Sequence, residues 1–150
     1  MENDKAINRI SADHVLRMKQ KADHPQNALD VYQQIATRSA IYPGQGTPLG
    51  LVYVALKMNG EAGELAEHVG KAMRDDGLTA PIGFGNGVEF ENLTEARRTL
   101  IIKEIGDVLW YLSAACNELC VNLSEVAQMN IEKLYDRGQR NALSGSGDER

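Results

Sequence analysis

The feature that most constrains this chain is a helical repeat of apolar residues in two long stretches. Over residues 49–74, apolar side chains recur at three- and four-residue steps, the spacing of one face of an α-helix. A second long helix is predicted over residues 94–119, where apolar residues lie nearly all round the helix. We therefore expect the second helix to be buried on more than one side.

Shorter helices are predicted before and after this pair. Residues 27–40 show helical spacing, and Asn27 stands where an N-cap is needed. The last helix is predicted over residues 124–137, with Ser124 as its N-cap and Gly138 as the residue that ends it.

Segments rich in glycine and proline separate these helices. Residues 42–48 contain two prolines and two glycines, which cannot continue an α-helix. Residues 75–93 are glycine-rich and predict a long loop, with Val88 and Phe90 the only hint of a strand. Long loops in compact domains are often functional.

These elements predict an all-α fold: a four-helix-type bundle with a long Gly-rich loop and flexible N- and C-terminal segments. A chain of 150 residues favours one domain. We assign residues 1–26 to an N-terminal arm, residues 27–138 to the helical domain and residues 139–150 to a flexible Gly/Ser tail.

Composition favours a protein that works in water. No apolar run approaches the roughly 20 residues that cross a bilayer, and the polar, acidic start does not resemble a secretion signal, so we expect no membrane association and a cytoplasmic location. A net charge of -5 argues against binding to a nucleic acid polymer, which depends on many Lys and Arg contacts. Cys116 and Cys120 lack the further ligands of a zinc site and are interpreted as buried thiols.

Two pairs of acidic residues are the candidates for a metal-binding site. Glu61 and Glu64 are three residues apart, so both lie on one helix face, and Glu104 and Asp107 repeat this spacing on the next long helix. Antiparallel packing would turn the pairs towards each other and place four carboxylates around one cavity, which suits Mg²⁺ or Mn²⁺. A di-iron bundle needs Glu-x-x-His pairs, and neither motif contains the histidine.

Either pair alone would be read as ordinary surface residues. The second pair, however, lies in apolar surroundings, where ionised carboxylates are costly unless a positive group is near. Each pair also has a glycine before its second acid, Gly63 and Gly106, which permits close approach of another helix or a ligand. His68, one turn after Glu64, is interpreted as a partner for its neighbours.

Gly60-Glu-Ala-Gly-Glu-Leu65 and Lys103-Glu-Ile-Gly-Asp-Val-Leu-Trp-Tyr111 resemble the ExxE and ExxD signature of the all-α, MazG-like NTP pyrophosphatase family. The resemblance continues in Asn130-Ile-Glu-Lys-Leu-Tyr-Asp-Arg137 and covers roughly residues 42–137. It implies hydrolysis of a nucleoside triphosphate between its α- and β-phosphates, which gives the monophosphate and pyrophosphate. Members are usually dimers or dimers of dimers with sites between subunits, so a homo-oligomer is implied.

The resemblance also implies roles for individual residues. The resemblance implies that the four acids form the catalytic set and bind Mg²⁺. From geometry alone, independently of the resemblance, we expect Glu64 to orient the attacking water, and the carboxylate ligands would also suit Mn²⁺. The residues that the resemblance implies bind the substrate are Tyr111, Asn130, Lys133 and Arg137. Lys71 is a further candidate for substrate binding that the resemblance does not supply. Two alternatives stay open: a helical metal- or nucleotide-binding regulatory module without hydrolysis, and a helical dimer used only for protein interaction.

Overall fold

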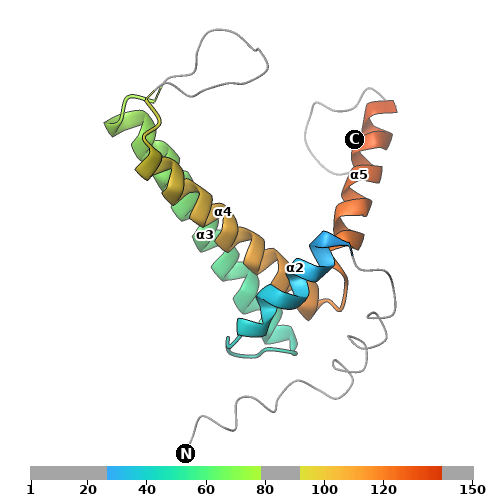
Figure 1. Ribbon diagram of the computed structural model, residues 1–150. Coiled ribbons are helices and arrows are strands. Elements are labelled where there is room, and N and C mark those ends of the chain that lie inside the picture. The colour runs from blue at the N-terminus through green and yellow to red at the C-terminus, as the bar shows by residue number, and fades with distance from the viewer. Residues whose placement is uncertain (1–26, 79–91, 140–150) are drawn as a thin grey trace, which may run out of the picture.

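In the computed structural model, which describes residues 27–78 and 92–139, every regular element is a helix (Figure 1). The elements are α2 (Ala28–Ala36), the 3₁₀ turn η2 (Thr37–Ser39), α3 (Pro48–Asp75), α4 (Glu95–Glu118) and α5 (Leu123–Gln139). The predicted all-α fold is confirmed. The predicted arm, most of the predicted loop with Val88 and Phe90, and nearly all of the predicted tail lie outside the described residues.

Side-chain caps place the starts of α2 and α4 where the sequence predicts them. The Asn27 carboxamide oxygen accepts hydrogen bonds from the backbone N–H groups of Leu29 at 2.8 Å and Asp30 at 3.3 Å. The Thr94 hydroxyl accepts one from Arg97 at 3.2 Å. Each bond satisfies an amide that has no partner within its helix, which makes these starts favourable.

The predicted ends of α5 are wrong in two details. Ser124 lies inside the first turn, because its backbone N–H and its hydroxyl donate to the Asp30 carboxylate at 3.0 and 2.8 Å and are not used as a cap. Glu125 instead accepts from the backbone N–H of Asn122 at 2.8 Å. Gly138 does not end the helix, which continues through Gln139, since glycine costs a helix only about 1 kcal/mol relative to alanine.

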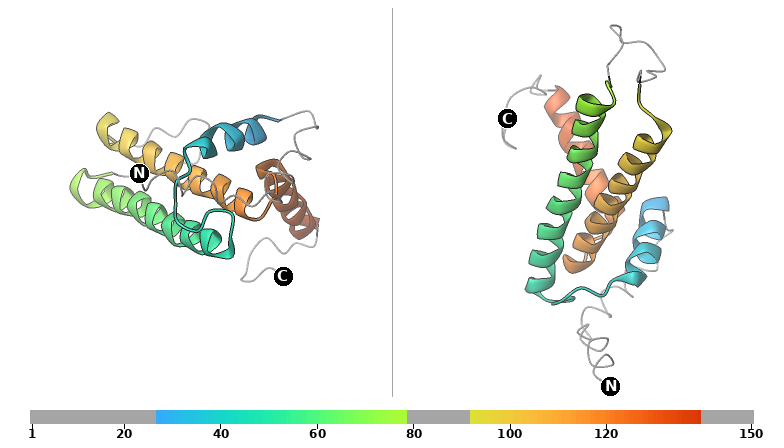
Figure 2. Two further views of the ribbon diagram at one scale, coloured as in Figure 1. Left: turned by 90° about the horizontal axis from the view of Figure 1, so that it is seen from below. Right: turned by 90° about the vertical axis from the view of Figure 1, so that its left-hand side faces the viewer.

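The centre of the fold is the antiparallel pair α3 and α4, which lie side by side in every view (Figures 1 and 2). Val54 and Ala72 of α3 and Ser113 and Ala114 of α4 are completely buried. Small side chains such as these let two helices approach closely, and their burial removes apolar surface from water.

Polar contacts fasten the end of the pair where α3 begins and α4 ends. The Glu118 carboxylate accepts hydrogen bonds from the Tyr42 hydroxyl at 2.5 Å and from the Gly46 backbone N–H at 3.0 Å. A Cβ on Gly50 would lie 2.5 Å from the Gly44 carbonyl oxygen, and Gly44 has a φ of 74°. Glycine is therefore required at both positions, Gly44 in the loop and Gly50 in the first turn of α3.

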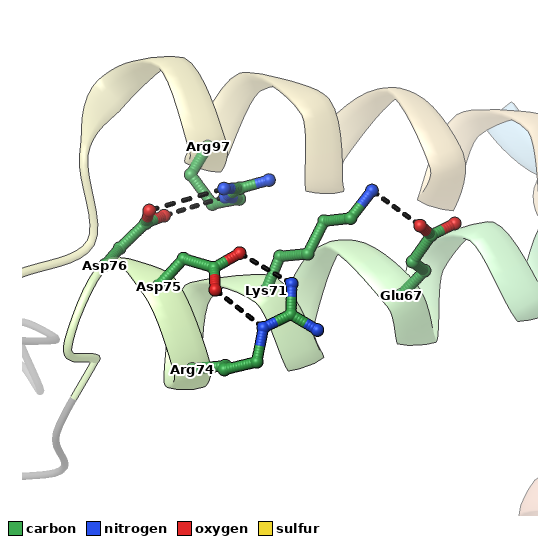
Figure 3. Close-up of polar contacts among 6 residues, drawn as sticks. All are labelled: Glu67, Lys71, Arg74, Asp75, Asp76 and Arg97. Carbon is green, nitrogen blue, oxygen red and sulfur yellow. Dashed lines mark hydrogen bonds and ion pairs between the residues drawn. The ribbon is translucent and has the colours of Figure 1, made fainter.

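Ion pairs gather at the opposite end of the pair (Figure 3). The Arg97 guanidinium of α4 lies 2.7 Å from the Asp76 carboxylate that follows α3, and this hydrogen-bonded partner lowers the pKa of Asp76. The Asn92 side-chain amide also donates to the Gly77 carbonyl oxygen at 3.1 Å. Both contacts join the two ends of the connection between α3 and α4.

A buried glutamine joins α2 to the turn between α4 and α5. The Gln33 amide group donates to the Asn117 side chain at 2.7 Å and to the Val121 carbonyl at 3.0 Å, and its oxygen accepts from the Leu123 backbone N–H at 2.7 Å. Only 4% of Gln33 is exposed. Beyond this junction α5 leads away from the α3–α4 pair, and it contacts α2 and α4 but not α3 (Figure 1).

We expect Gln33→Leu to lower the free energy of unfolding by about 2–3 kcal/mol, because it leaves buried partners such as Leu123 N–H without a hydrogen bond. Chemical denaturation at one protein concentration measures this difference. Gln128→Leu, at an exposed position of α5, is the matched control and should change stability by less than about 0.5 kcal/mol. Equal effects of the two substitutions would contradict the structural role of Gln33.

Candidate metal centre

Three of the four predicted acids converge between α3 and α4. Glu61 and Glu64 of α3 and Glu104 of α4 each offer a carboxylate oxygen, and these oxygens all lie within 4.8 Å of one another. Ligands at about 2.1 Å from Mg²⁺ lie roughly 3–4 Å from one another, so a small movement of the side chains would let one ion contact all three. The predicted convergence of the two acidic motifs is therefore seen for these residues.

The acid set, defined here as Glu61, Glu64 and Glu104, is buried on one side and open on the other. The side chains of Glu104 and Glu61 are only 12% and 14% exposed, and Glu64 is exposed. Carboxylates this close repel one another, and withdrawal from water makes their ionised forms more costly. A hard divalent cation with oxygen ligands would offset both effects, so the donor set fits Mg²⁺ or Mn²⁺.

Two side chains of α3 contact the less exposed acids. The Lys57 ammonium lies 3.5 Å from the Glu61 carboxylate, and the His68 Nε2 lies 3.7 Å from the Glu104 carboxylate. The placement of His68 agrees with its interpretation as a partner for its neighbours, but the neighbour lies on another helix. Sequence reasoning missed this contact, although the positions of His68 four residues after Glu64 and seven after Glu61 place all three on one helix face.

Asp107 is not part of the acid set. Its side chain is exposed on α4, three residues beyond Glu104, and it acts on the neighbouring Tyr111. Burial raises the pKa of Tyr111, and the negative charges of Glu61 and Asp107 raise it further while Lys57 lowers it. Asp107 thus lies at the edge of the same charged region, and its role as a ligand stays a prediction.

An aromatic group lies beside these charges. Tyr111 contacts Trp110 edge to face with ring centres 4.9 Å apart, Trp110 contacts Tyr42 at 6.3 Å, and Tyr42 stacks on Tyr53 at 5.8 Å. Tyr111 was predicted from the sequence as a site residue, whereas Tyr42 and Tyr53 were not. Tyr53 lies eight residues before Glu61 on the same helix, whereas Tyr42 comes from the loop before α3 and had no such signal.

The two motif glycines have open space beside them. A Cβ on Gly63 or on Gly106 would meet nothing within 4 Å, so the expectation that another helix packs closely there is wrong within this chain. The completely buried residues of α3 and α4, such as Val54 and Ala114, lie at other positions of the two helices. The open space beside Gly63 and Gly106 is compatible with the other expectation, that a ligand approaches closely there.

The chain does not bring the remaining candidate residues to the acid set. Lys71 of α3 forms an ion pair with Glu67 (Figure 3). On α5, Asn130 and Lys133 are exposed and Arg137 is 6% exposed. Because α5 leads away from α3, its three candidate residues are not placed beside the acids within one chain (Figure 1).

The apolar surface of α4 is only partly covered. Ile102, Ile105 and Leu112 lie on one face of the helix and are 48%, 51% and 40% exposed. α3 covers one side of α4, and α2 with η2 contacts the half of α4 that contains Trp110 and Asn117. The expectation that α4 is buried on more than one side is therefore met there, but not on the face of Ile102, Ile105 and Leu112. On α5, Met129 and Tyr135 are each 69% exposed.

A pair of long antiparallel helices that presents converging carboxylates is the arrangement expected of an all-α nucleotide pyrophosphohydrolase. Residues 53–140 match the family described as MazG nucleotide pyrophosphohydrolase domain, and the chain belongs to this family. The resemblance drawn from the motifs is confirmed, and the chain is a hydrolase of the nucleotide pyrophosphohydrolase type.

A relative is found among bacteriophage proteins. The chain is 40% identical over 126 residues to the "Gene 37 protein" of Mycobacterium phage L5, an alignment that covers 81% of this chain and 98% of the phage protein. No solved structure matches the chain significantly. Within the described residues, none of the helices is both long and apolar enough to cross a bilayer.

We expect Mg²⁺ or Mn²⁺ to raise the melting temperature of the protein over that in EDTA, because a ligand that binds only the folded state stabilises it. Glu104→Gln should abolish this rise and leave the metal-free protein at least as stable, since it removes a buried charge from the acid set. Thermal melting with and without metal measures both effects. Glu67→Gln, outside the acid set on α3, is the control; an undiminished rise in Glu104→Gln would argue against this metal centre.

Proposed function

We propose that the protein hydrolyses nucleoside or deoxynucleoside triphosphates at the bond between the α- and β-phosphates, in a reaction that depends on Mg²⁺. The products are the nucleoside monophosphate and pyrophosphate. The observation that carries this proposal is the convergence of Glu61, Glu64 and Glu104 within 4.8 Å between two helices. Family membership gives the coarser activity, and the acid set supports the metal dependence.

We expect the three acids to have different roles, which follow from how exposed each one is. When bound, a divalent ion neutralises phosphate charge and lowers the pKa of an attacking water. Glu104 and Glu61, the less exposed acids, would hold the ion from the inner side of the site. Glu64 faces solvent, so it is the acid that can orient the water and accept its proton. Asp107 would join as a further ligand after a side-chain rearrangement.

Residues around the acid set can bind the base and the phosphates of a nucleotide. Tyr111 presents a partly buried ring next to Glu61, and an aromatic ring can stack against any base. Lys57 and Lys71 carry positive charge on α3 on either side of the acids, where they can attract phosphates. Lys71 would first have to release Glu67, an exposed ion pair of small stability.

We further propose that the working form is a homodimer or a dimer of dimers. The apolar stripe of α4, defined here as Ile102, Ile105 and Leu112, is exposed in one chain, as are Met129 and Tyr135 of α5. Large exposed apolar patches usually mark interfaces. A second copy that covers them would also bring the α5 residues of one chain towards the acid set of the other. The exposed Asn130 and Lys133 would then bind the phosphates across the interface, and Arg137, which is 6% exposed, would join them after a rearrangement of its side chain.

A non-hydrolytic metal- or nucleotide-binding module is the second candidate. The observation in its favour is that only three of the four predicted acids form the acid set, with Asp107 outside it. Such a module would bind a nucleotide and metal without releasing product.

Incubation of the protein with a panel of NTPs and dNTPs plus Mg²⁺ should release pyrophosphate and the monophosphate. Glu64→Gln should lower the rate by about 10²–10⁴-fold, the contribution of a general base, with little change in melting temperature. Asp75→Asn, an exposed acid at the far end of the same helix that pairs with Arg74, is the matched control and should leave the rate unchanged. Orthophosphate as the only phosphate product would contradict the cleavage position, and nucleotide binding without any product would favour the non-hydrolytic module.

Sedimentation velocity should show an oligomer that Ile102→Glu weakens, because the substitution places a charge in an apolar interface and the ionised group loses its hydration. Ile102 is 48% exposed on the α4 stripe, whereas Ile41 is 93% exposed in the segment before α3. Ile41→Glu is therefore the control and should sediment as the wild type does. A monomeric wild-type protein would overturn the proposed oligomer.

A further inference from the structure

We propose that His68 is a positioning residue that holds the Glu104 carboxylate in the orientation in which it receives the divalent cation. This inference rests on the proposed function, because it assigns a role to a residue beside the same acid set. The role is indirect: His68 contacts Glu104 and acts through it.

The contact joins the two helices that form the site. His68 lies on α3 and Glu104 on α4, and the Nε2 of the imidazole lies 3.7 Å from one carboxylate oxygen. Both side chains are largely withdrawn from water, at 19% and 12% exposed. A polar contact between two such groups is screened less than one on the surface, so it can bias the rotamer of the glutamate.

The two ring nitrogens of His68 have different surroundings. Its Nδ1 is buried and has no hydrogen-bond partner in the part of the chain that the structure describes. The Nε2 therefore provides the polar contact through which the ring is oriented, and it can donate a hydrogen bond to Glu104 after a small closure of the distance. With one carboxylate oxygen held in this way, the other is available to the cation.

His68 is assigned a positioning role because it lies outside the set of mutually close ligand atoms. The three atoms within 4.8 Å of one another come from Glu61, Glu64 and Glu104. Mg²⁺ also prefers oxygen ligands to imidazole. Residues that hydrogen-bond to metal ligands fix the orientation of those ligands, and their loss typically weakens metal affinity or activity about 10–100-fold.

Glu104 is the acid with the greatest need for such a partner. It is the least exposed of the three, and it is the one that α4 contributes opposite two acids of α3. Lys57 provides a comparable contact for Glu61 at 3.5 Å. Each of the two less exposed acids thus has a polar partner on α3, and the more exposed Glu64 faces solvent.

The test compares His68→Leu with His68→Gln in the full-length protein. Electron paramagnetic resonance of free Mn²⁺ gives the Kd for the metal without nucleotide, and pyrophosphate release gives the activity. His68→Leu should raise the Kd about tenfold or more, whereas His68→Gln, whose amide N–H can replace the imidazole donor, should stay within about threefold of wild type. Asn59→Leu is the matched control, because Asn59 is an exposed polar residue of α3 outside the acid set.

The outcomes separate this inference from the proposed function. A wild-type protein that binds Mn²⁺ and releases pyrophosphate, together with an unchanged Kd in His68→Leu, would overturn the role of His68 alone. A wild-type protein that does neither would overturn both proposals. Thermal melting shows whether His68→Leu folds. If it does not fold, the measurement on His68→Gln tests the inference instead. A folded His68→Gln protein whose Kd for Mn²⁺ is raised tenfold or more would contradict the role of His68 as a hydrogen-bond donor.

Discussion

The close antiparallel packing of α3 against α4 is the constraint on which the candidate site depends. Completely buried small residues, Val54, Ala72 and Ala114 among them, bring the two helices together along their length. That approach places carboxylates from both helices in a common space, although their mutual repulsion opposes it. Apolar burial along the pair, together with the positive charge of Lys57 beside Glu61, offsets this repulsion.

Contacts at both ends hold the register of this pair. Glu118 binds the loop before α3 at one end, and Arg97 pairs with Asp76 at the other. A slip of one helix past the other by a turn would move Glu104 about 5.4 Å and separate it from the α3 acids. Polar groups far from the acid set therefore contribute to its geometry, because they determine which residues of α3 face Glu104.

One chain covers only part of its own apolar surface. α3 covers one side of α4 and α2 contacts another, whereas Ile102, Ile105 and Leu112 remain exposed, and α5 leads away from the α3–α4 pair (Figure 1). Association of copies would give these residues a partner and would bring Asn130, Lys133 and Arg137 of α5 towards the acid set of another copy. The same surfaces would then serve stability and substrate binding.

The sequence by itself determined the local features. Helical periodicity placed α3 and α4, Asn27 and Thr94 capped the helices that they precede, and three-residue spacing put each acidic pair on one face. These features depend on neighbours within about one helical turn. Tertiary structure alone decided the contacts that join distant residues: Ser124 with Asp30, Tyr42 with Glu118, and His68 with Glu104. No local sequence pattern predicts these contacts, because each one depends on how whole helices pack against one another.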